Sequence, residues 1–359
     1  MTTCAILVNF HGAIDTANAA RSALADWPDL ELVVVDNSTD AVEFGTLRSL
    51  LPESAKVWAA PVNLGFGSAC NAALAQTHAD YIFLVNPDVH ILPGCIWNLH
   101  LALSKNERLA AVAPLQTLDT GLSWRLPPSW FPTPLRAWAT ELAMHDPAKA
   151  KRLSLALRAE SVRYWTATEA VSQRALSGGV MLLRRSALGA AEPLFDPQFF
   201  MYFEDSDLCH RLKSRGFELA VVPKAQAVHA WRNHPHKNEM MAESAPKYFA
   251  KHGGRDNRWL VKQTQLAMQP QPRALLSLPA DFPPGGAVVP VPWQAHWLLE
   301  LSPSPMLSPA IGHLGTGPVV ETPGNALAHF EGATVYGRLG PASTLVAADN
   351  CKYFEWSVT

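Results

Sequence analysis

The sequence has no excess of positive charge. Its 359 residues include 29 Lys and Arg against 31 Asp and Glu, which gives a formal net charge of −2 at pH 7. Proteins that bind nucleic acid along its backbone normally show a basic excess. We therefore expect no nucleic-acid partner, and any anionic substrate must be met by a local group of residues.

Cysteine is scarce and irregularly spaced. The five cysteines show no Cys-x-x-Cys pair and no Cys/His spacing typical of a metal site: Cys4, Cys70, Cys95, Cys209 and Cys351. We expect reduced thiols, as in a cytoplasmic protein. Residues 1–9 lack the basic region of a signal peptide, and no apolar run reaches the roughly 18 residues of a membrane span.

A glycine-rich nucleotide loop is missing after the first predicted strand. Residues 4–10 form a mostly apolar run, typical of a strand buried on both faces. A dehydrogenase would carry its G-x-G-x-x-G fingerprint directly after this strand, whereas Gly65 and Gly67 come later and lack the third glycine. A sugar nucleotidyltransferase would carry a glycine-rich loop with a cation there, and residues 9–15 hold no Lys or Arg. The sequence therefore argues against both enzyme classes.

The first part of the chain alternates predicted strands and helices. Strands are expected at residues 4–10, 30–35, 56–58 and 80–85, with helices at residues 17–27 and after Gly67. Such alternation predicts an α/β fold built on a sheet with parallel strands, in which ligands bind beyond the carboxyl ends of the strands. Asp36 stands at that edge, either as a turn residue or as part of a binding site.

A carboxylate also follows the strand expected at residues 80–85. The sequence there reads Asn86-Pro87-Asp88, and proline holds the local backbone at a fixed φ. Hard cations such as Mg²⁺ or Mn²⁺ are commonly bound by one or two carboxylates together with phosphate oxygens. Asp88 is therefore a candidate metal ligand, and the alternative is an ordinary Pro-Asp turn.

Three carboxylates lie within four residues, directly after the aromatic run at residues 199–203: Glu204, Asp205 and Asp207. Asp and Glu are seldom buried unless something pairs with them or uses them. A helical pattern begins here, so one interpretation is a helix cap made by Asp205 or Ser206, with Asp207 in the first turn. The other interpretation is a functional site at the start of the helix.

Residues 123–174 have an unusual composition. Tryptophan and proline are frequent in the first part, and a basic helix is expected at residues 147–164. Residues 124–185 hold ten Lys or Arg against four Asp or Glu. The segment is either an acceptor-side lid or membrane-surface patch, where Trp and basic residues meet anionic lipid, or an ordinary surface helix with a proline-rich loop.

The chain changes character from Gln269 onwards. Residues 270–359 hold 13 of the 29 prolines and only three Lys or Arg. Short apolar runs at residues 297–301, 333–336 and 344–346 alternate with turn signals, which predicts a small β-rich module. Oligomerisation, partner binding, or sugar binding through Trp293 and Trp297 are the roles that this composition leaves open.

Four motifs occur in a fixed order along the chain: Val33–Ser38, Asn63–Gly67 with Asn71, Leu84–Asp88 and Phe203–Leu208. Their order and spacing resemble those of family 2 inverting glycosyltransferases, in particular the bacterial rhamnosyltransferase-like branch, over roughly residues 1–255. The resemblance implies a GT-A nucleotide-sugar-binding fold, which is a Rossmann-like mixed sheet flanked by helices. The expected domains are 1–268, made of a nucleotide-binding half (1–122), an acceptor-side insertion (123–174) and a catalytic half (175–268), followed by the β-rich module at 269–359.

The resemblance implies an inverting, metal-dependent sugar transfer. Asp205 matches the general base of the family, with Glu204 and Asp207 as its neighbours. Asp88 matches the last Asp of the family's DxD metal motif, and His229 aligns with a histidine that completes the site for Mg²⁺ or Mn²⁺. The first position of that motif is here Asn86, so the site has one negative charge fewer with which to hold the cation.

The resemblance also implies a donor and an acceptor. The donor would be a nucleotide-diphosphate sugar, either dTDP-L-rhamnose or a UDP- or GDP-sugar. The acceptor would be a hydroxyl of a glycan, of a lipid-linked glycan, or of another molecule such as a protein or small molecule. The residues that the resemblance implies for binding the nucleotide and the donor sugar are Asn9, Asp36, Asn63, Gly65, Asn71, Asn86, Gly178 and Gly179. Arg232, His234, His236 and Lys237 are further candidates to meet the diphosphate.

Three further expectations accompany this reading. The protein would contact the inner face of a membrane peripherally, and it would form a homo-oligomer through the C-terminal module. It would take part in polysaccharide biosynthesis. The main alternative is a catalytically weak or inactive transferase-like binding or scaffold protein, which Asn86 and the unexplained C-terminal module would suit.

Overall fold

The computed structural model describes residues 2–144, 146–189, 192–232, 236–254, 282–283, 286–331, 333–346 and 350–357. The chain divides into two compact units. Unit 1 consists of residues 1–116, 129–131 and 168–252, and unit 2 of residues 117–128, 132–167 and 253–359. This division differs from the predicted domains, because most of the insertion expected at residues 123–174 belongs with the C-terminal module.

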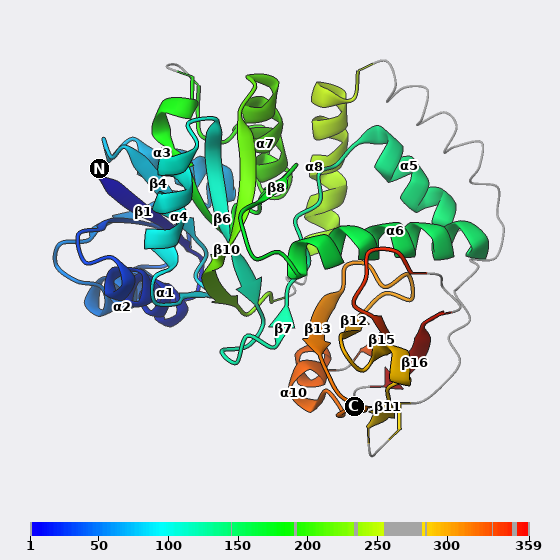
Figure 1. The fold of residues 1–359 in the computed structure, drawn as a ribbon. Helices are drawn as coiled ribbons and strands as arrows, with labels where there is room; N and C mark the ends of the chain where they lie inside the picture. Colours follow the sequence, from blue (N-terminus) through cyan, green and yellow to red (C-terminus); the bar gives the residue numbers. More distant parts are fainter. Residues whose placement is uncertain are drawn as a thin grey trace. The chain divides into compact units, whose positions relative to one another are not determined.

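Unit 1 is built on a mixed sheet (Figure 1). Its parallel strands lie in the order β4 (Tyr81–Val85), β1 (Thr3–Asn9), β2 (Glu31–Asp36) and β3 (Lys56–Ala59). Beyond β4 the sheet continues antiparallel with β9 (Val180–Arg184) and β6 (Leu109–Thr117). β1, β2, β4, β9 and β6 are mostly buried along their length, as is typical of apolar strands inside a sheet, whereas the edge strand β3 is largely exposed.

Helices accompany these strands: α1 (Ala13–Asp26), α2 (Ala41–Leu50), α3 (Gly65–Leu74), α4 (Cys95–Lys105), η1 (Arg185–Ala187), α7 (Glu204–Ser214) and α8 (Lys237–His252). One core cluster contains residues of α1, α4 and the sheet strands, including Ala20, Leu99 and Phe83. The described part of the chain holds no helix that is both long and apolar enough to cross a membrane.

A long strand brings distant residues of unit 1 to the end of β4. This strand, β10 (Glu218–His229), pairs antiparallel with β5 (Val89–Ile91) and β8 (Val171–Gln173). It is one continuous strand of 12 residues, and it runs through Pro223. Its register places His229 opposite Val89, next to the motif that follows β4.

Unit 2 contains an antiparallel sheet in the order β16 (Lys352–Ser357), β15 (Thr334–Pro341), β12 (Trp297–Ser302), β13 (Ile311–Gly315) and β7 (Trp124–Arg125). The other elements are α5 (Pro134–Ala143), α6 (Pro147–Trp165), β11 (Ala287–Val288), η2 (Val291–Trp293), β14 (Val319–Val320), α10 (Gly324–Leu327) and η3 (Ala328–Phe330). A β-rich module was predicted here, and the strand at residues 297–301 is found. Residues 344–346 form no strand.

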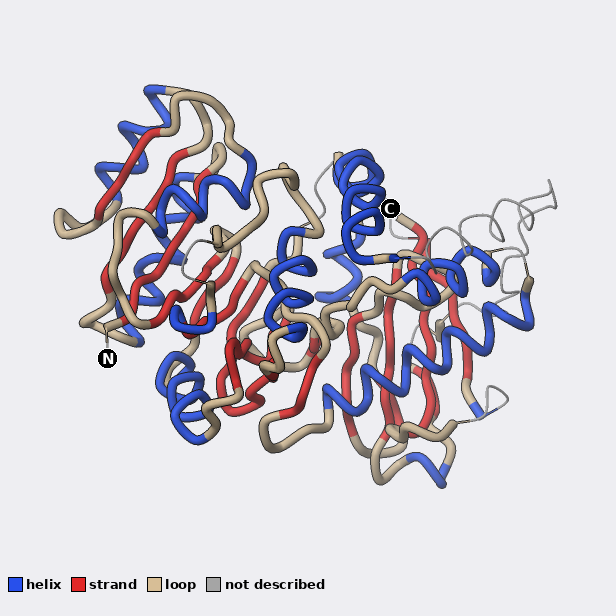
Figure 2. Tube along the Cα trace, turned by 90° about the horizontal axis from the view of Figure 1, so that it is seen from above, coloured by secondary structure: helices blue, strands red, loops and turns tan. Residues whose placement is uncertain are grey.

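Helix α6 lies along one face of the unit 2 sheet (Figures 1 and 2). A buried ion triad joins them: the carboxylate of Glu300 on β12 accepts hydrogen bonds from Arg158 of α6 at 2.9 Å and from Arg338 of β15 at 2.7 and 2.8 Å. Buried charges are tolerated only when they are paired in this way. The triad explains why α6 belongs to the same unit as a strand that lies 142 residues away in the sequence.

Candidate active site

Asp88 and His229 form the first cluster of the site. His229 Nε2 lies 3.2 Å from Asp88 Oδ1, and the backbone N–H of Ala230 donates to the Asp88 carbonyl at 3.0 Å. Gln116 Oε1 lies 2.7 Å from His229 Nδ1, so this ring nitrogen donates its proton to Gln116. His229 Nε2 is then left to face the Asp88 carboxylate, or a cation bound beside it.

The electrostatics of Asp88 suit a charged carboxylate. Burial opposes its ionisation, but the hydrogen bond and charge of His229 outweigh this effect and hold the pKa of Asp88 below its ordinary value. The group is therefore ionised at neutral pH. Sequence reasoning missed Gln116, because it lies on β6 far from every motif and nothing in its neighbourhood marks it.

The residues at this cluster fit a divalent cation that is held jointly with a ligand. Asp88 and His229 supply one carboxylate and one imidazole, and Mg²⁺ typically uses few protein ligands and completes its shell with water and substrate phosphates. Within the described ranges, no group of three or more His, Cys, Asp or Glu side chains is arranged to hold a metal on its own. The implied cation would thus depend on the phosphates of a bound nucleotide.

The second cluster lies at the start of α7. The predicted cap by Asp205 or Ser206 is wrong, because the helix begins at Glu204 with Phe203 in the cap position and no side-chain cap bond. Phe203 and the preceding Tyr202 have φ values of 68° and 66°. Such left-handed conformations of bulky residues cost on the order of 1–3 kcal/mol each and occur often at functional sites.

Asp205 and Glu204 differ in their surroundings. Asp205 is half-buried and accepts hydrogen bonds from the backbone N–H of Ser206 at 2.6 Å and from that of Gly178 at 3.3 Å. Burial nevertheless raises the pKa of Asp205. Glu204 is buried, and one of its oxygens has no hydrogen-bond partner among the described residues. Burial, with the neighbouring Asp205 charge, raises the pKa of Glu204 to about 8, so Asp205 is the carboxylate that ionises first.

Asp207 has different partners from its two neighbours. It is completely buried and accepts from Arg211 Nε at 2.9 Å, Lys251 Nζ at 2.7 Å and His252 Nε2 at 2.7 Å. Burial opposes its ionisation, but these donors outweigh it and lower the pKa of Asp207. The geometry makes Asp207 an anchor between α7 and α8, and the predicted catalytic role has no support in its contacts.

A pair of glycines connects the two clusters. The Gly178 N–H binds Asp205, whereas a Cβ atom on Gly179 would lie only 3.1 Å from Asn86 Nδ2 and 3.3 Å from His229 Cε1. The backbone N–H of Asn86 also donates to the Gly179 carbonyl at 2.7 Å. Two consecutive residues before β9 thus touch both the carboxylate predicted as a base and the residues predicted to hold the cation.

The ends of β1 and β2 form a third group. The strand register places Asn9 opposite Asp36, and Asn9 Nδ2 donates to Asp36 Oδ1 at 2.9 Å. The Ser38 hydroxyl donates to the same oxygen at 2.7 Å. Both Asn9 and Asp36 are almost fully buried. They shape the edge of the sheet where the nucleotide was predicted to bind, and their contact with a nucleotide stays a prediction.

The predicted nucleotide loop is held by side-chain amides. Asn37 donates to Asn63 Oδ1 at 3.0 Å and to the Gly65 carbonyl at 3.1 Å. Gly65 has a φ of 75°, and a Cβ there would overlap the Phe200 carbonyl oxygen at 2.2 Å. This close approach joins the loop to the segment before α7. Asn37 was missed as a bracing residue, although it lies within the motif at residues 33–38.

Asn71 and the residues predicted to meet the diphosphate contact other parts of the protein. Asn71 uses both ends of its amide to hold the Phe195 backbone, at 2.7 and 3.0 Å, so its role in binding nucleotide stays a prediction. Arg232 pairs with Asp15 at 2.5 Å, and His236 lies 3.0 Å from Glu239. His234 lies outside the described residues.

The fold and the arrangement of these clusters define a glycosyltransferase of the GT-A class. A family model described as glycosyltransferase-like family 2 matches residues 16–261, which is more than half of the chain. The chain belongs to this family. The predicted α/β GT-A fold, the family and the enzyme class are therefore confirmed.

Two L-rhamnosyltransferases are among the curated proteins that this chain resembles. An N-acetylglucosaminyl-diphospho-decaprenol L-rhamnosyltransferase of Mycobacterium tuberculosis (strain CDC 1551 / Oshkosh) is 28% identical over 263 residues, covering 65% of this chain and 75% of the relative. The protein of the same name from strain ATCC 25618 / H37Rv matches equally.

Among solved structures, a mannosyltransferase of Pyrobaculum calidifontis in complex with GDP-Man and Mn²⁺ has a TM-score of 0.46 at 12% identity, with 74% of this chain and 73% of that chain covered. GalNAc-T7 with UDP, GalNAc and Mn²⁺ has a TM-score of 0.45 at 17% identity, covering 74% of this chain and 54% of that chain.

Proposed function

We propose that this glycosyltransferase moves L-rhamnose from a nucleotide-diphosphate sugar to a hydroxyl of a lipid-linked glycan, with inversion at the anomeric carbon. The name of the curated relatives supports the choice of sugar and acceptor. The observation that carries the chemistry is the glycine pair, because Gly178 binds Asp205 while Gly179 lies against Asn86 and His229. This puts a carboxylate and a candidate cation site on either side of two consecutive residues.

Asp205 acts as the general base in this proposal. It is partly accessible, and burial raises its pKa, which makes it a better proton acceptor than an ordinary aspartate. Its carboxylate removes the proton from the acceptor hydroxyl as the oxygen attacks the anomeric carbon. Direct displacement by one nucleophile inverts the configuration at that carbon, and the nucleoside diphosphate leaves.

Glu204 supports this role through its protonation state. With a pKa of about 8 it is neutral at pH 7, so it does not compete with Asp205 as a second buried charge. Two carboxyl groups whose surroundings separate their pKa values commonly take separate roles in catalysis. In this proposal Glu204 sets the electrostatic environment of Asp205, and Asp207 holds α7, the helix on which both carboxyl groups lie.

Asp88 and His229 hold the divalent cation in this proposal. When bound, Mg²⁺ or Mn²⁺ neutralises the negative charge that develops on the leaving diphosphate. Gln116 keeps the His229 ring oriented. Asn86 replaces a carboxylate by a neutral amide, so we expect weaker cation binding in the absence of nucleotide than a site with two acidic groups would give.

An enzyme that acts on a lipid-linked acceptor meets this acceptor at a membrane surface. Helix α6 supports this, because it carries four exposed cations: Lys149, Lys151, Arg152 and Arg163. Basic residues near a surface of anionic lipid each add about 1 kcal/mol to binding. We propose peripheral binding at the cytoplasmic face of a membrane. Sedimentation with anionic and with neutral vesicles tests this, and equal binding to both would contradict it.

A donor panel tests the proposed reaction. The protein is incubated with dTDP-L-rhamnose, a UDP-hexose or a GDP-hexose, together with an N-acetylglucosaminyl-diphospho-lipid and Mn²⁺, and the product is identified by mass spectrometry. We expect rhamnosyl transfer, with the anomeric configuration opposite to that of the donor by NMR. Transfer from another donor alone would overturn the proposed sugar, and retained configuration would overturn the mechanism.

A further inference from the structure

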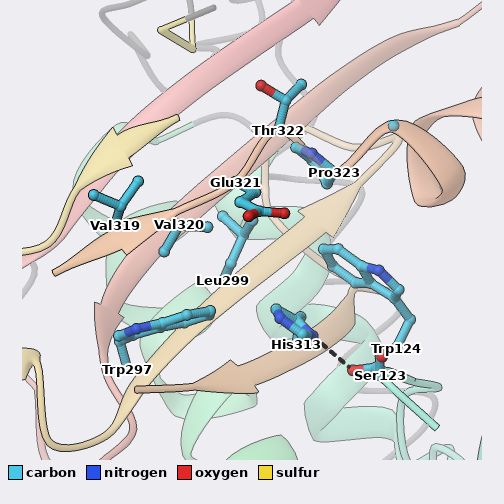
Figure 3. Close-up of a pocket in the computed structure, with 11 residues that line it drawn as sticks. Ser123, Trp124, Trp297, Leu299, His313, Val319, Val320, Glu321, Thr322 and Pro323 are labelled. Atoms are coloured by element: carbon cyan, nitrogen blue, oxygen red, sulfur yellow. Dashed lines mark hydrogen bonds between the residues drawn. The ribbon is translucent and has the colours of Figure 1, made fainter. Parts of the chain in front are cut away.

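Unit 2 contains a pocket of about 520 Å³ beside β12 and β13 (Figure 3). Trp124 and Trp297 in its wall are more than nine-tenths buried, so they offer no open ring face to a ligand. Glu321 is exposed and is the one carboxylate among the described residues that line the pocket. A single accessible carboxylate selects no particular class of ligand, whereas the edge of the unit 1 sheet carries a connected group of polar side chains.

This connected group joins α2 to the end of β1 and the start of α1. The Glu43 carboxylate, in the first turn of α2, accepts from Asn9 Nδ2 at 3.0 Å and from the backbone N–H of Ala13 at 2.8 Å. Asn9 is the last residue of β1, and Ala13 is the first residue of α1. Glu43 therefore holds both sides of the short turn, residues 10–12, that connects β1 to α1.

The Asn9 amide is used completely within the protein. The two shortest hydrogen bonds of its Nδ2 atom go to Asp36 Oδ1 at 2.9 Å and to Glu43 Oε1 at 3.0 Å. Its oxygen accepts from the backbone N–H of Gly12 at 3.3 Å and from the Thr16 hydroxyl at 2.8 Å. A primary amide has two N–H donors and one oxygen with two lone pairs. Asn9, which is fully buried, thus connects Asp36 to the turn and presents no group to solvent.

The turn presents rings rather than backbone donors. The backbone N–H groups of residues 11–13 each donate to a side chain, so they are not available to a phosphate, which commonly binds such groups at a helix N-terminus. His11 has a φ of 50°, a conformation that its surroundings must hold in place. The rings of Phe10 and His11 are exposed, with their centroids 4.8 Å apart. This edge is therefore better suited to the nucleoside end of a donor than to its phosphates.

We propose that Glu43 is a positioning residue for the nucleoside end of the donor. The inference rests on the proposed function, in which the donor nucleotide binds beyond the carboxyl ends of β1 and β2. Among the described residues, the Glu43 carboxylate bonds only Asn9 and Ala13. Without it, one N–H group of each residue loses its acceptor, and the turn and Asp36 are no longer held in one arrangement before the donor binds. The cost of ordering them then falls on the binding step.

Calorimetric titration with dTDP, UDP and GDP tests the proposal. Glu43→Ala should raise the Kd of the nucleoside diphosphate that the wild type binds most tightly by about tenfold. Glu43→Gln keeps an oxygen acceptor for both N–H groups, so its Kd should stay within about threefold of the wild-type value. The ratio of the Kd in EDTA to the Kd with Mn²⁺ should be unchanged in both variants, because Glu43 does not contact the residues proposed to hold the cation.

Asp26→Ala is the matched control. Asp26 lies at the other end of α1 and accepts from the backbone N–H groups of Gly94 at 2.5 Å and Ile96 at 2.7 Å, at the start of α4. It holds the start of α4 much as Glu43 holds the start of α1. Its loss should therefore lower the melting temperature about as much as the loss of Glu43, while the Kd of the nucleotide stays at the wild-type value.

Three results would overturn the proposal. They are a wild-type Kd in Glu43→Ala, an equal rise of the Kd in Asp26→Ala, and a reduced effect of Mn²⁺ in Glu43→Ala, since the last two would indicate a general loss of structure. If none of the three nucleoside diphosphates bound the wild type, the proposed function would fail together with this inference. Wild-type binding that Glu43→Ala leaves unchanged would remove this inference alone.

Discussion

The backbone N–H of Gly178 donates to Asp205 Oδ2 at 3.3 Å, which connects the start of β9 to the start of α7. The next residue, Gly179, lies against Asn86 and His229. The proposed base and the proposed cation site therefore share one piece of backbone. Changes at this dipeptide should disturb both functions, whereas changes in one cluster should leave the other intact.

Gly179→Ala should weaken nucleotide binding. The added Cβ would lie 3.1 Å from Asn86 Nδ2 and 3.3 Å from His229 Cε1, which forces these side chains to move. Overpacking of this kind costs about 1–3 kcal/mol, so we expect about a tenfold rise in the Kd of a nucleoside diphosphate with Mn²⁺. Gly45→Ala is the control, because a Cβ at Gly45 meets nothing within 4 Å. Equal Kd values for the two variants would contradict the close packing at Gly179.

Asp88→Asn should remove the dependence of nucleotide binding on a divalent cation. The wild type should bind a nucleoside diphosphate more tightly with Mn²⁺ than with EDTA, because the ionised Asp88 beside His229 holds the cation against the phosphates. Calorimetry of the variant should give similar Kd values under both conditions, while Asp29→Asn, at an exposed position, should behave as the wild type does. A variant that keeps the full effect of Mn²⁺ would exclude Asp88 from the cation site.

Asp207→Asn should lower the stability of the protein. The substitution leaves Arg211, Lys251 and His252 around a neutral amide, and breaking a buried ion pair costs about 3–5 kcal/mol. Because Arg211 and Lys251 are partly exposed, we expect a value near the lower end, about 3 kcal/mol, from urea unfolding. Glu243→Gln breaks only an exposed pair with Lys247 and should cost less than about 1 kcal/mol.

The same variant separates two roles for Asp207. If Asp207 only anchors α7 to α8, the folded fraction of Asp207→Asn should retain most of the wild-type turnover at low temperature. If the variant were as stable as the wild type yet inactive, Asp207 would belong to the catalytic group after all.

Glu204→Gln should change how stability depends on pH. The pKa of Glu204 is raised from 4.5 to about 8 in the folded protein, so the folded state binds more protons than the unfolded state between these values. The stabilisation that protonated Glu204 contributes is fully present below pH 4.5 and is lost as the pH rises towards 8. The wild type should thus lose melting temperature relative to the variant over this range, and a constant difference by calorimetry would contradict the raised pKa.

Part of this site follows from where the strands end. Asn9, Asp36 and Asp88 come directly after apolar runs, and parallel strands bring such residues to one edge of the sheet, so their positions could be predicted. His229 reaches Asp88 only because β10 pairs with β5 in one particular register. That register depends on packing between distant segments, and the sequence alone does not reveal it.

Other features depend on conformations that no local pattern marks. The start of α7 at Glu204 rests on two left-handed residues, Tyr202 and Phe203, whose side chains give no sign of it. The place of α6 in unit 2 rests on the contact between Arg158 and Glu300. In both cases tertiary contacts stabilise an arrangement that residue preferences alone would not indicate.

The most direct test of the proposed mechanism is the turnover of Asp205→Asn. The amide keeps the size of the side chain but cannot accept the proton, so kcat should fall by about 10²–10⁴. The Kd of the donor nucleotide with Mn²⁺, measured by calorimetry on the same preparation, should stay close to that of the wild type. A variant that binds the donor and still turns over at a near-normal rate would show that Asp205 is not the base.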